Sequence, residues 1–240
     1  MKAVAIIPAR LASTRLPRKP LRELNGKPMI QHVYEAARSA EGLADVIVAT
    51  DAPEIMQLCD SHGWHAQLTS PQHRSGTDRV HEVASALDAE VFINVQGDEP
   101  LTRPEHLTAL LALMHDPGIM VGTLMVVCLP DDIANPNAVK VVADVNGRAL
   151  YFSRATIPHD RDRTGAVPYF KHLGFYAYRK TALDRFVTLP ESDLERAERL
   201  EQLRFLQNGI PIYVAETPFD TVGVDTEEDV RRVEVMLRSR

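Results

Sequence analysis

Cysteine is scarce in this chain, and long apolar runs are missing from it. The 240 residues include only two cysteines, Cys59 and Cys128, which is too few for a disulfide framework and suits a reducing compartment. No run approaches the ~18 apolar residues that a membrane-spanning helix needs. The first eight residues are too short and too strand-like for a signal peptide. We therefore expect a cytoplasmic protein with no membrane insertion.

The chain also lacks a basic excess and a zinc-binding pattern of histidines. Its formal net charge is −6 and its isoelectric point is about 5.8, which argues against nonspecific binding to nucleic acid. The nine histidines show no metal-ligand spacing, so zinc chemistry is not expected. Small anionic ligands remain the favoured partners.

Short apolar segments alternate with amphipathic ones in the first half of the chain. We expect strands at residues 3–7, 46–49 and 91–95, and helices at residues 30–39, 53–62, 77–87 and 104–115. Strands that alternate with helices predict βαβ units. The expected fold is α/β, with a mostly parallel, Rossmann-like sheet flanked by helices.

The second half is richer in strands, which we expect at residues 120–127, 139–143, 149–152, 170–178 and 212–214. Asn146-Gly147 predicts a hairpin between two of them. Helices are expected at residues 180–187, 194–208 and 229–238, the second with Ser192 and Glu195 as a capping box and Gly209 as its stop. We interpret residues 1–240 as a single domain with a β-rich antiparallel elaboration around residues 120–180. This elaboration could cover a substrate pocket or pair subunits.

A basic loop that has no glycine before Gly26 follows the first strand. Six basic residues and one acid lie between Arg10 and Lys27, and the first glycine is Gly26. The loop is therefore neither a Walker loop nor a dinucleotide fingerprint. Phosphate binding would depend on side chains, with Arg10 and Lys19 as the candidates, unless the loop is only a solvated surface.

Two aspartates follow apolar segments in the manner of ligand-binding residues at strand ends. Asp98 stands in Gln96-Gly-Asp-Glu99, where it suits Mg²⁺, although Gly97-Asp98 could simply form the turn into the next helix. Asp225 precedes a helix and could be its N-cap. Paired with Asp98, it could instead hold a metal for phosphoryl or nucleotidyl transfer.

Three further segments carry candidate binding residues. Ser75-Gly76-Thr77 precedes a helix and suits a base edge or an anion, or Thr77 is an ordinary N-cap. Arg154 could bind a substrate carboxylate bidentately. His172, close to aromatic residues, is more often a packed core residue than a ligand.

Together these segments resemble the 3-deoxy-manno-octulosonate cytidylyltransferase family, whose members couple CTP to the eight-carbon acid sugar Kdo. The resemblance implies a nucleotidyltransferase sheet, a homodimer, Mg²⁺ and a role in lipopolysaccharide synthesis. The matching segments span nearly the whole chain in order: IIPARLASTRLPRKPL (6–21), NGKPMI (25–30), IVATD (47–51), RSGTDR (74–79), NVQGDEPL (94–101), NPNAVKVV (135–142), YFSRATIP (151–158), KHLGFYAY (171–178), LEQLRFL (200–206) and GVDTEEDV (223–230).

The resemblance also implies a role for each site residue. The catalytic residues would be Arg10, Lys19, Asp98 and Asp225, the last two as metal ligands. The nucleotide would contact Ala9, Arg10, Ser13, Lys19, Ser75, Gln96 and Gly97. The acid sugar would contact Arg154, His172, Tyr176, Glu201 and Gln202. Arg18 replaces the glycine that is usual before the family's lysine, and Arg74 replaces a smaller or neutral residue, so we expect loop closure and affinity to differ.

The expected reaction is an in-line attack of the sugar's anomeric 2-hydroxyl on the α-phosphorus of CTP, with pyrophosphate leaving. Positioning and charge neutralisation would catalyse it without a covalent nucleophile. The alternatives are the same chemistry on 8-amino-Kdo or a sialic acid, another nucleotide base, or an inactive nucleotide-binding homologue. The joint presence of Lys19, Asp98 and Asp225 argues against an inactive protein.

Overall fold

A mixed sheet of nine strands organises the chain, in the order β11-β7-β10-β6-β1-β4-β5, with β8 beside β10 and β9 beside β8. We describe residues 1–13, 15–73 and 75–239 from a computed structural model. The strands are β1 (Ala3–Ala9), β4 (Asp45–Thr50), β5 (Ala66–Leu68), β6 (Val91–Asn94), β7 (Val121–Val127), β8 (Lys140–Ala143), β9 (Ala149–Ser153), β10 (Phe170–Arg179) and β11 (Tyr213–Glu216). Strands β5, β4, β1 and β6 run parallel, and β10 is antiparallel to both β6 and β7. The predicted α/β fold is confirmed.

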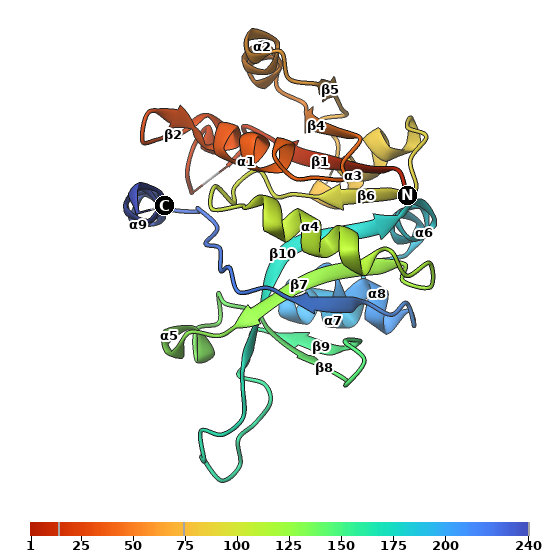
Figure 1. The fold of residues 1–240 in the computed structure, drawn as a ribbon, viewed down its shortest axis with the longest axis vertical. Helices are drawn as coiled ribbons and strands as arrows, with labels where there is room; N and C mark the ends of the chain where they lie inside the picture. The colour runs from red at the N-terminus through yellow and green to blue at the C-terminus, as the bar shows by residue number, and fades with distance from the viewer. Residues whose placement is uncertain (14, 74, 240) are drawn as a thin grey trace.

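Helices cover both faces of the sheet. Consecutive side chains of a strand point to opposite faces, and in the central strands the side chains on both faces are apolar, so both faces need a covering layer. In β1, Ala5 and Ile7 join one buried cluster, while Val4 and Ile6 join the other. The first cluster includes helices α1 (Met29–Arg38), α2 (Pro53–His62) and α4 (Pro104–Leu113). The second includes α3 (Gly76–Ser85), α6 (Lys180–Thr188) and α8 (Leu203–Gln207). Figure 1 shows α1 and α4 in front of the sheet and α6 and α8 behind it.

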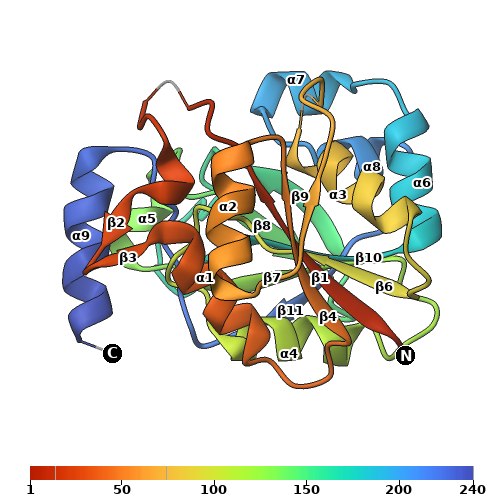
Figure 2. The same cartoon turned by 90° about the horizontal axis from the view of Figure 1, so that it is seen from above.

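A third apolar cluster fastens the C-terminal helix to the basic loop. Helix α9 (Glu227–Arg238) lies beside a small hairpin of β2 (Glu23–Leu24) and β3 (Lys27–Pro28), as Figure 2 shows. Leu16 and Leu24 pack there with Val230 and Val233 of α9. The hairpin turns through Asn25-Gly26, both at positive φ, a turn signal that our sequence analysis did not use. The end of the chain thus supports the loop near its beginning.

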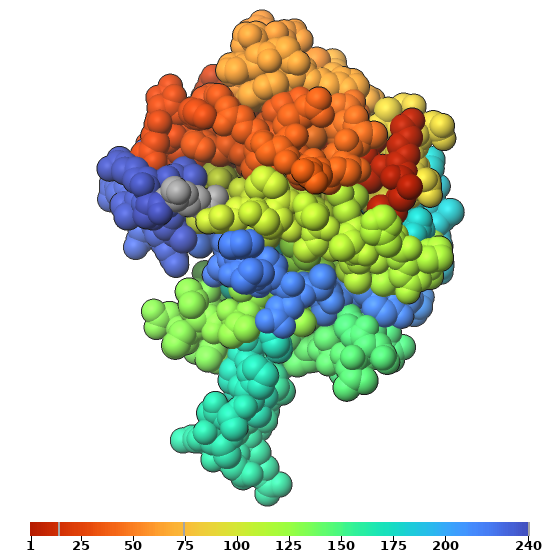
Figure 3. Space-filling model, viewed as in Figure 1, coloured from red at the N-terminus to blue at the C-terminus, as the bar shows by residue number. Residues whose placement is uncertain are grey.

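The β-rich elaboration lies at one end of the sheet. Strands β8 and β9 are antiparallel and joined at Asn146-Gly147, which confirms the predicted hairpin. Helix α5 (Pro130–Ile133) follows β7, and the connection between β9 and β10 includes a loop that projects from the body (Figures 1 and 3). No helix among the described residues is long and apolar enough to cross a membrane.

The helix predicted at residues 194–208 is wrong as a single element. Helix α7 (Asp193–Glu198) ends at Arg199, whose φ of 55° is left-handed, and α8 begins at Leu203. The predicted capping box is confirmed, because Ser192 Oγ accepts a hydrogen bond from the Glu195 amide at 3.2 Å. The break between the two helices places residues 199–202 on the wall of the cavity described next.

Candidate active site

A cavity of about 880 Å³ opens beyond the carboxyl ends of β1 and β6. This is the position at which open α/β sheets bind ligands. Every site residue expected from the sequence lies on its wall: Ala9, Arg10, Ser13, Lys19, Ser75, Gln96, Gly97, Asp98, Arg154, His172, Tyr176, Glu201, Gln202 and Asp225. The fold therefore brings residues from both halves of the chain into one site.

A partly buried ammonium joins the two aspartates on this wall. Lys19 Nζ lies 2.6 Å from Asp98 Oδ2 and 2.8 Å from Asp225 Oδ1. Lys19 belongs to a short 3-10 helix, η1 (Lys19–Leu21), and Asp98 follows β6. Burial by itself would lower the pKa of Lys19, but the charges and hydrogen bonds of Asp98 and Asp225 outweigh it and raise that pKa. The side chain is therefore a fixed positive charge.

The non-catalytic alternatives for the two aspartates do not match the structure. The N-cap of α9 is Thr226, whose hydroxyl accepts a hydrogen bond from the Asp229 amide, so the Asp225 carboxylate is not used for capping. Gly97 and Asp98 do form a turn, in which the Glu99 amide donates to the Gln96 carbonyl at 3.2 Å, but this turn does not lead directly into a helix, because α4 begins only at Pro104. Gly97 is needed for close packing, since a Cβ there would lie 2.9 Å from the Pro8 carbonyl oxygen of β1.

Two carboxylates beside a basic loop suit Mg²⁺, which takes one or two protein carboxylates and completes its shell with phosphate oxygens and water. The side chains of Asp98 and Asp225 are 36% and 44% exposed, so ligands can reach them. Among the residues that the structure describes, no group of three or more acidic, histidine or cysteine side chains could hold a metal ion alone. A metal here would need the nucleotide as a further ligand.

The N-terminus of α3 forms the second wall. Ser75, and not Thr77, is its N-cap: Ser75 Oγ accepts a hydrogen bond from the Asp78 amide at 3.1 Å. Thr77 Oγ1 instead donates to Glu201 Oε2 at 2.9 Å. The helix end supplies backbone amides and a positive dipole to the cavity. Arg74, part of the same motif, lies outside the described residues.

The basic loop forms the mouth of the cavity. Arg10 is exposed there and forms no ion pair with any described residue. Arg15 Nη2 lies 2.9 Å from Asp225 Oδ2. Arg18 adopts a φ of 57° and pairs with Glu54 of α2. Glycine adopts a left-handed backbone more readily than arginine does, which is consistent with the glycine that the resemblance implies at this position.

A β-bulge in β10 shapes the third wall. The pairing of β10 with β7 shifts between Leu173 and Tyr176, and bulges commonly re-aim side chains at active sites. Thr123 Oγ1 donates to the Phe175 carbonyl at 2.6 Å and lies 3.0 Å from His172 Nε2. The Thr123 hydroxyl has only one proton, so this network assigns the ring proton to Nε2 and leaves Nδ1 as an acceptor. Burial lowers the pKa of His172 to about 3, so the ring is neutral, and it lines the cavity instead of being only a packed core residue.

Two buried polar atoms of this wall lack a partner. Tyr176 Oη and Gln202 Nε2 make no hydrogen bond within the described part of the chain. Such atoms are costly to leave unsatisfied, which favours a polar ligand beside them. Burial also raises the pKa of Glu201, against the opposing effect of its hydrogen bond from Thr77.

Arg154 is engaged mainly with the backbone. Its Nε donates to the Glu198 carbonyl at 2.8 Å, and its two terminal nitrogens donate to the carbonyls of Pro136 and Arg199 at 3.0 and 3.4 Å. It therefore braces the corner between α7 and α8. One N–H on each terminal nitrogen remains for a ligand.

Sequence reasoning missed several residues of the wall, including Asn94 and Tyr178. Burial raises the pKa of Tyr178, and the neighbouring side chains of Thr77 and Asn94 oppose that rise. Asn94 is 1% exposed and ends an otherwise apolar strand. A polar residue at a core position was the available signal.

Comparisons with known proteins agree with this geometry. A family model described as cytidylyltransferase matches residues 4–215. The 3-deoxy-manno-octulosonate cytidylyltransferase of Koribacter versatilis (strain Ellin345) is 68% identical, over 100% of this chain and 92% of that protein. The one from Acidobacterium capsulatum is 58% identical, over 100% of this chain and 98% of that protein. A solved structure of CMP:2-keto-3-deoxy-manno-octonic acid synthetase complexed with CTP has a TM-score of 0.95 and 45% identity, over 100% of this chain and 99% of that one.

Proposed function

The chain belongs to the 3-deoxy-manno-octulosonate cytidylyltransferase family, which activates Kdo with CTP, and we propose that its cavity divides this reaction between a nucleotide half and a sugar half. The products are CMP-Kdo, for lipopolysaccharide synthesis, and pyrophosphate. The observation that carries the proposal is the Lys19 ammonium between Asp98 and Asp225, on the wall of a cavity large enough for both substrates.

The nucleotide half consists of the basic loop and the N-terminus of α3. Arg10 and Lys19 bind the triphosphate and stabilise charge on the departing pyrophosphate, helped by Ser13 and by the Ala9 backbone. Ser75, Gln96 and Gly97 contact the nucleoside. Removing one such cationic contact should cost about 10²–10³ in kcat, as the loss of a single preorganised donor does elsewhere.

Asp98 and Asp225 are the residues that would hold Mg²⁺. The bound ion would neutralise phosphate charge and lower the pKa of the attacking hydroxyl. Lys19 hydrogen-bonds to both carboxylates and neutralises part of their charge. The charges of Lys19, Asp98 and Asp225 therefore compensate one another in the free protein. When a triphosphate and a metal ion bind, the same three side chains compensate the charges of these ligands.

The sugar half consists of the β10 bulge and the α7–α8 corner. Arg154, His172, Tyr176, Glu201 and Gln202 bind the acid sugar. Tyr176 and Gln202 offer buried polar atoms that have no partner among the described residues, and the neutral His172 ring can accept a hydrogen bond from a sugar hydroxyl at Nδ1. These contacts orient the anomeric 2-hydroxyl for in-line attack on the α-phosphorus. The new bond joins that oxygen to phosphorus, the bond to pyrophosphate breaks, and the hydroxyl proton passes to solvent.

Pyrophosphate release tests the proposed function. CTP with Kdo and Mg²⁺ should give rapid release, and omission of Mg²⁺ should abolish it. Higher kcat/KM with 8-amino-Kdo or a sialic acid would change the sugar assignment, and equal rates with UTP or ATP would overturn the cytidine assignment. CTP binding without release for any sugar would indicate an inactive nucleotide-binding protein.

The β-rich elaboration supports two further parts of this proposal. The chain acts as a single domain, 1–240, and forms a homodimer through the elaboration. Val127, Leu129 and Val167 are 52%, 54% and 37% exposed there, and apolar exposure of this kind marks interfaces. Light scattering should give twice the 26.8 kDa chain mass, and a monomer would contradict this assignment.

We also propose that the enzyme is cytoplasmic, because its proposed substrate CTP is found there.

A further inference from the structure

Asp225 lies at the end of a segment that has no regular secondary structure. Residues 217–226, called the strap here, connect β11 to α9 outside any described helix or strand. Figure 1 shows the strap crossing the sheet from β11 to α9. An irregular segment receives no ladder of hydrogen bonds, so its course depends on individual contacts. The position of the Asp225 carboxylate depends on the same contacts.

The strap is attached to several elements of the sheet. Its Thr217 amide donates to the Met125 carbonyl of β7 at 2.9 Å. Thr221 Oγ1 donates to Glu99 Oε2. The Val224 amide donates to the Asp98 carbonyl at 3.0 Å, which ties the strap directly to the residue that Asp225 faces.

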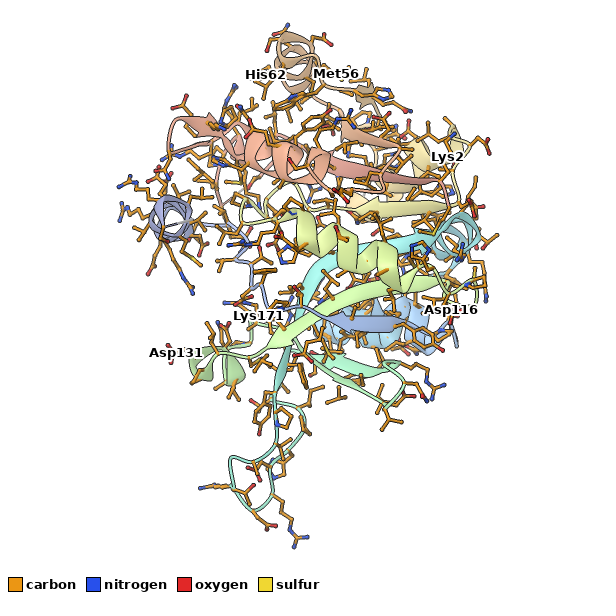
Figure 4. The ribbon with its side chains drawn as sticks, in the orientation of Figure 1. Lys2, Met56, His62, Asp116, Asp131 and Lys171 are labelled. Atoms are coloured by element: carbon orange, nitrogen blue, oxygen red, sulfur yellow. The ribbon has the colours of Figure 1, made fainter. Side chains whose placement is uncertain are left out.

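One side chain supplies a charged attachment. Lys171 of β10 donates through Nζ to Asp220 Oδ2 at 3.0 Å and to the Thr221 carbonyl at 3.2 Å. The same nitrogen donates to Asp132 Oδ2 of α5 at 3.2 Å. Figure 4 shows Lys171 between the strap and α5. Three acceptors from two segments therefore meet at one ammonium.

The surroundings of this ammonium make the contact stronger than a surface ion pair. The side chains of Lys171, Asp132 and Asp220 are only 12%, 16% and 25% exposed. Partly buried charges of this kind are poorly screened, and loss of one partner leaves an unpaired charge. Lys171 does not line the cavity, so it does not belong to the set of substrate-contacting residues.

We propose that Lys171 is a positioning residue for nucleotidyl transfer: by joining the strap to α5 through Asp220 and Asp132, it holds Asp225 opposite Asp98. This inference rests on the proposed function, because it assigns a divalent cation bound with CTP to those two aspartates. Residues that orient metal ligands from outside the coordination shell usually contribute about 10–100-fold to metal affinity or activity.

The test compares Lys171→Met with Lys171→Arg and with a matched control, Lys180→Met. Lys180 lies directly after the same strand and pairs with Asp184 at 3.3 Å, away from the strap. Two quantities are measured for each folded variant. One is the dissociation constant of Mn²⁺ in the presence of CTP without sugar, from the electron paramagnetic resonance signal of free Mn²⁺. The other is the separate kcat and KM for Kdo, from pyrophosphate release.

Lys171→Met should weaken Mn²⁺ binding and lower kcat by about 10-fold or more, while the KM for Kdo changes less than about twofold. Lys171→Arg should keep most of both quantities, and Lys180→Met should match the wild type. A Lys171→Met protein that melts at a lower temperature but keeps normal Mn²⁺ affinity and kcat would overturn the proposal, because the role would then be only structural.

A second variant decides the matter if Lys171→Met does not fold. Asp132→Asn removes the charge on the α5 side and leaves Lys171 paired with Asp220. It should weaken Mn²⁺ binding in the same direction, by a few-fold, and an unchanged affinity would overturn the proposal. If the wild type releases no pyrophosphate from CTP and Kdo, the proposed function fails by itself, whereas the Mn²⁺ comparison still decides the role of Lys171.

Discussion

Lys19→Met should make the nucleotide-free protein bind divalent cations more tightly. The Lys19 ammonium lies within 2.8 Å of both Asp98 and Asp225, so any cation that binds these two carboxylates must compete with it. Removal of the ammonium leaves two neighbouring negative charges, of which Asp225 keeps its pair with Arg15 and Asp98 loses its cationic partner. The same substitution removes a triphosphate contact and should lower turnover. Affinity for the ion and catalysis therefore change in opposite directions.

The size of the effect follows from the exposure of the ion pairs. Each aspartate side chain is more than a third exposed, at 36% and 44%, so solvent screening limits each pair to about 1 kcal/mol. Two pairs give ~1–2 kcal/mol, which corresponds to roughly 5–30-fold in the Mn²⁺ dissociation constant. The titration is run without nucleotide, by the resonance signal of free Mn²⁺.

A matched control separates competition at the site from a general change in charge. Arg22→Met also removes one positive charge from the basic loop region, but Arg22 pairs with Glu227 at 2.8 Å and contacts neither aspartate. The double variant Lys19→Met/Asp98→Asn should lose the gain in affinity. The reasoning is refuted if Lys19→Met binds Mn²⁺ no more tightly than Arg22→Met does.

Three further predictions follow from the same geometry. Asp98→Asn or Asp225→Asn should abolish pyrophosphate release while changing the free energy of unfolding by no more than about 1 kcal/mol, since each loses only part-exposed ion pairs; near-normal activity at limiting Mg²⁺ would contradict the metal assignment. Burial raises the pKa of Glu99 from 4.5 to about 7. Between these two pH values the folded state keeps a proton on Glu99 that the unfolded state loses. The free energy of unfolding should therefore decline as the pH rises from 4.5 to 7, by roughly 3 kcal/mol from this group. Glu99→Gln should remove that decline, and parallel denaturation curves for variant and wild type across this range would exclude it. Arg18→Gly should be more stable than Arg18→Ala by about 1 kcal/mol, because both lose the pair with Glu54 but only alanine keeps a side chain at positive φ; equal melting temperatures would argue against strain at this position.

The ends of strands could be predicted from the sequence because their signals are local. An apolar run that stops at Ala9 or at Val95 marks the edge of a sheet, and the polar residues after it lie at the site. The basic loop and Asp98 were found in this way. Strand neighbours were not readable in the same way: β10 was expected to be antiparallel, but its place between β6 and β7 depends on pairing across the sheet, which no local pattern encodes.

The α7–α8 corner and the strap show a second limit. Residues 194–208 have a helical pattern throughout, yet Arg199 takes a left-handed conformation that breaks the helix. Arg154 holds that corner from the end of β9 through the carbonyls of Glu198 and Arg199. The energy that overrides local helix propensity comes from contacts distant in sequence, so the break could not be predicted from the segment itself.

The absence of glycine from the basic loop has a structural consequence. A glycine-rich loop wraps phosphates with its own backbone, whereas this loop must present side chains such as Arg10 and Lys19 from a conformation that other parts of the chain maintain. Leu16 is 2% exposed in the cluster that includes Val230 and Val233 of α9, and Asp225 meets Lys19 just before α9 begins. The C-terminal segment therefore stabilises the basic loop through apolar contacts and also supplies the Asp225 carboxylate that pairs with Lys19. Catalytic competence should accordingly require that the strap and α9 be in place, even though most of the substrate contacts that we propose come from residues earlier in the chain.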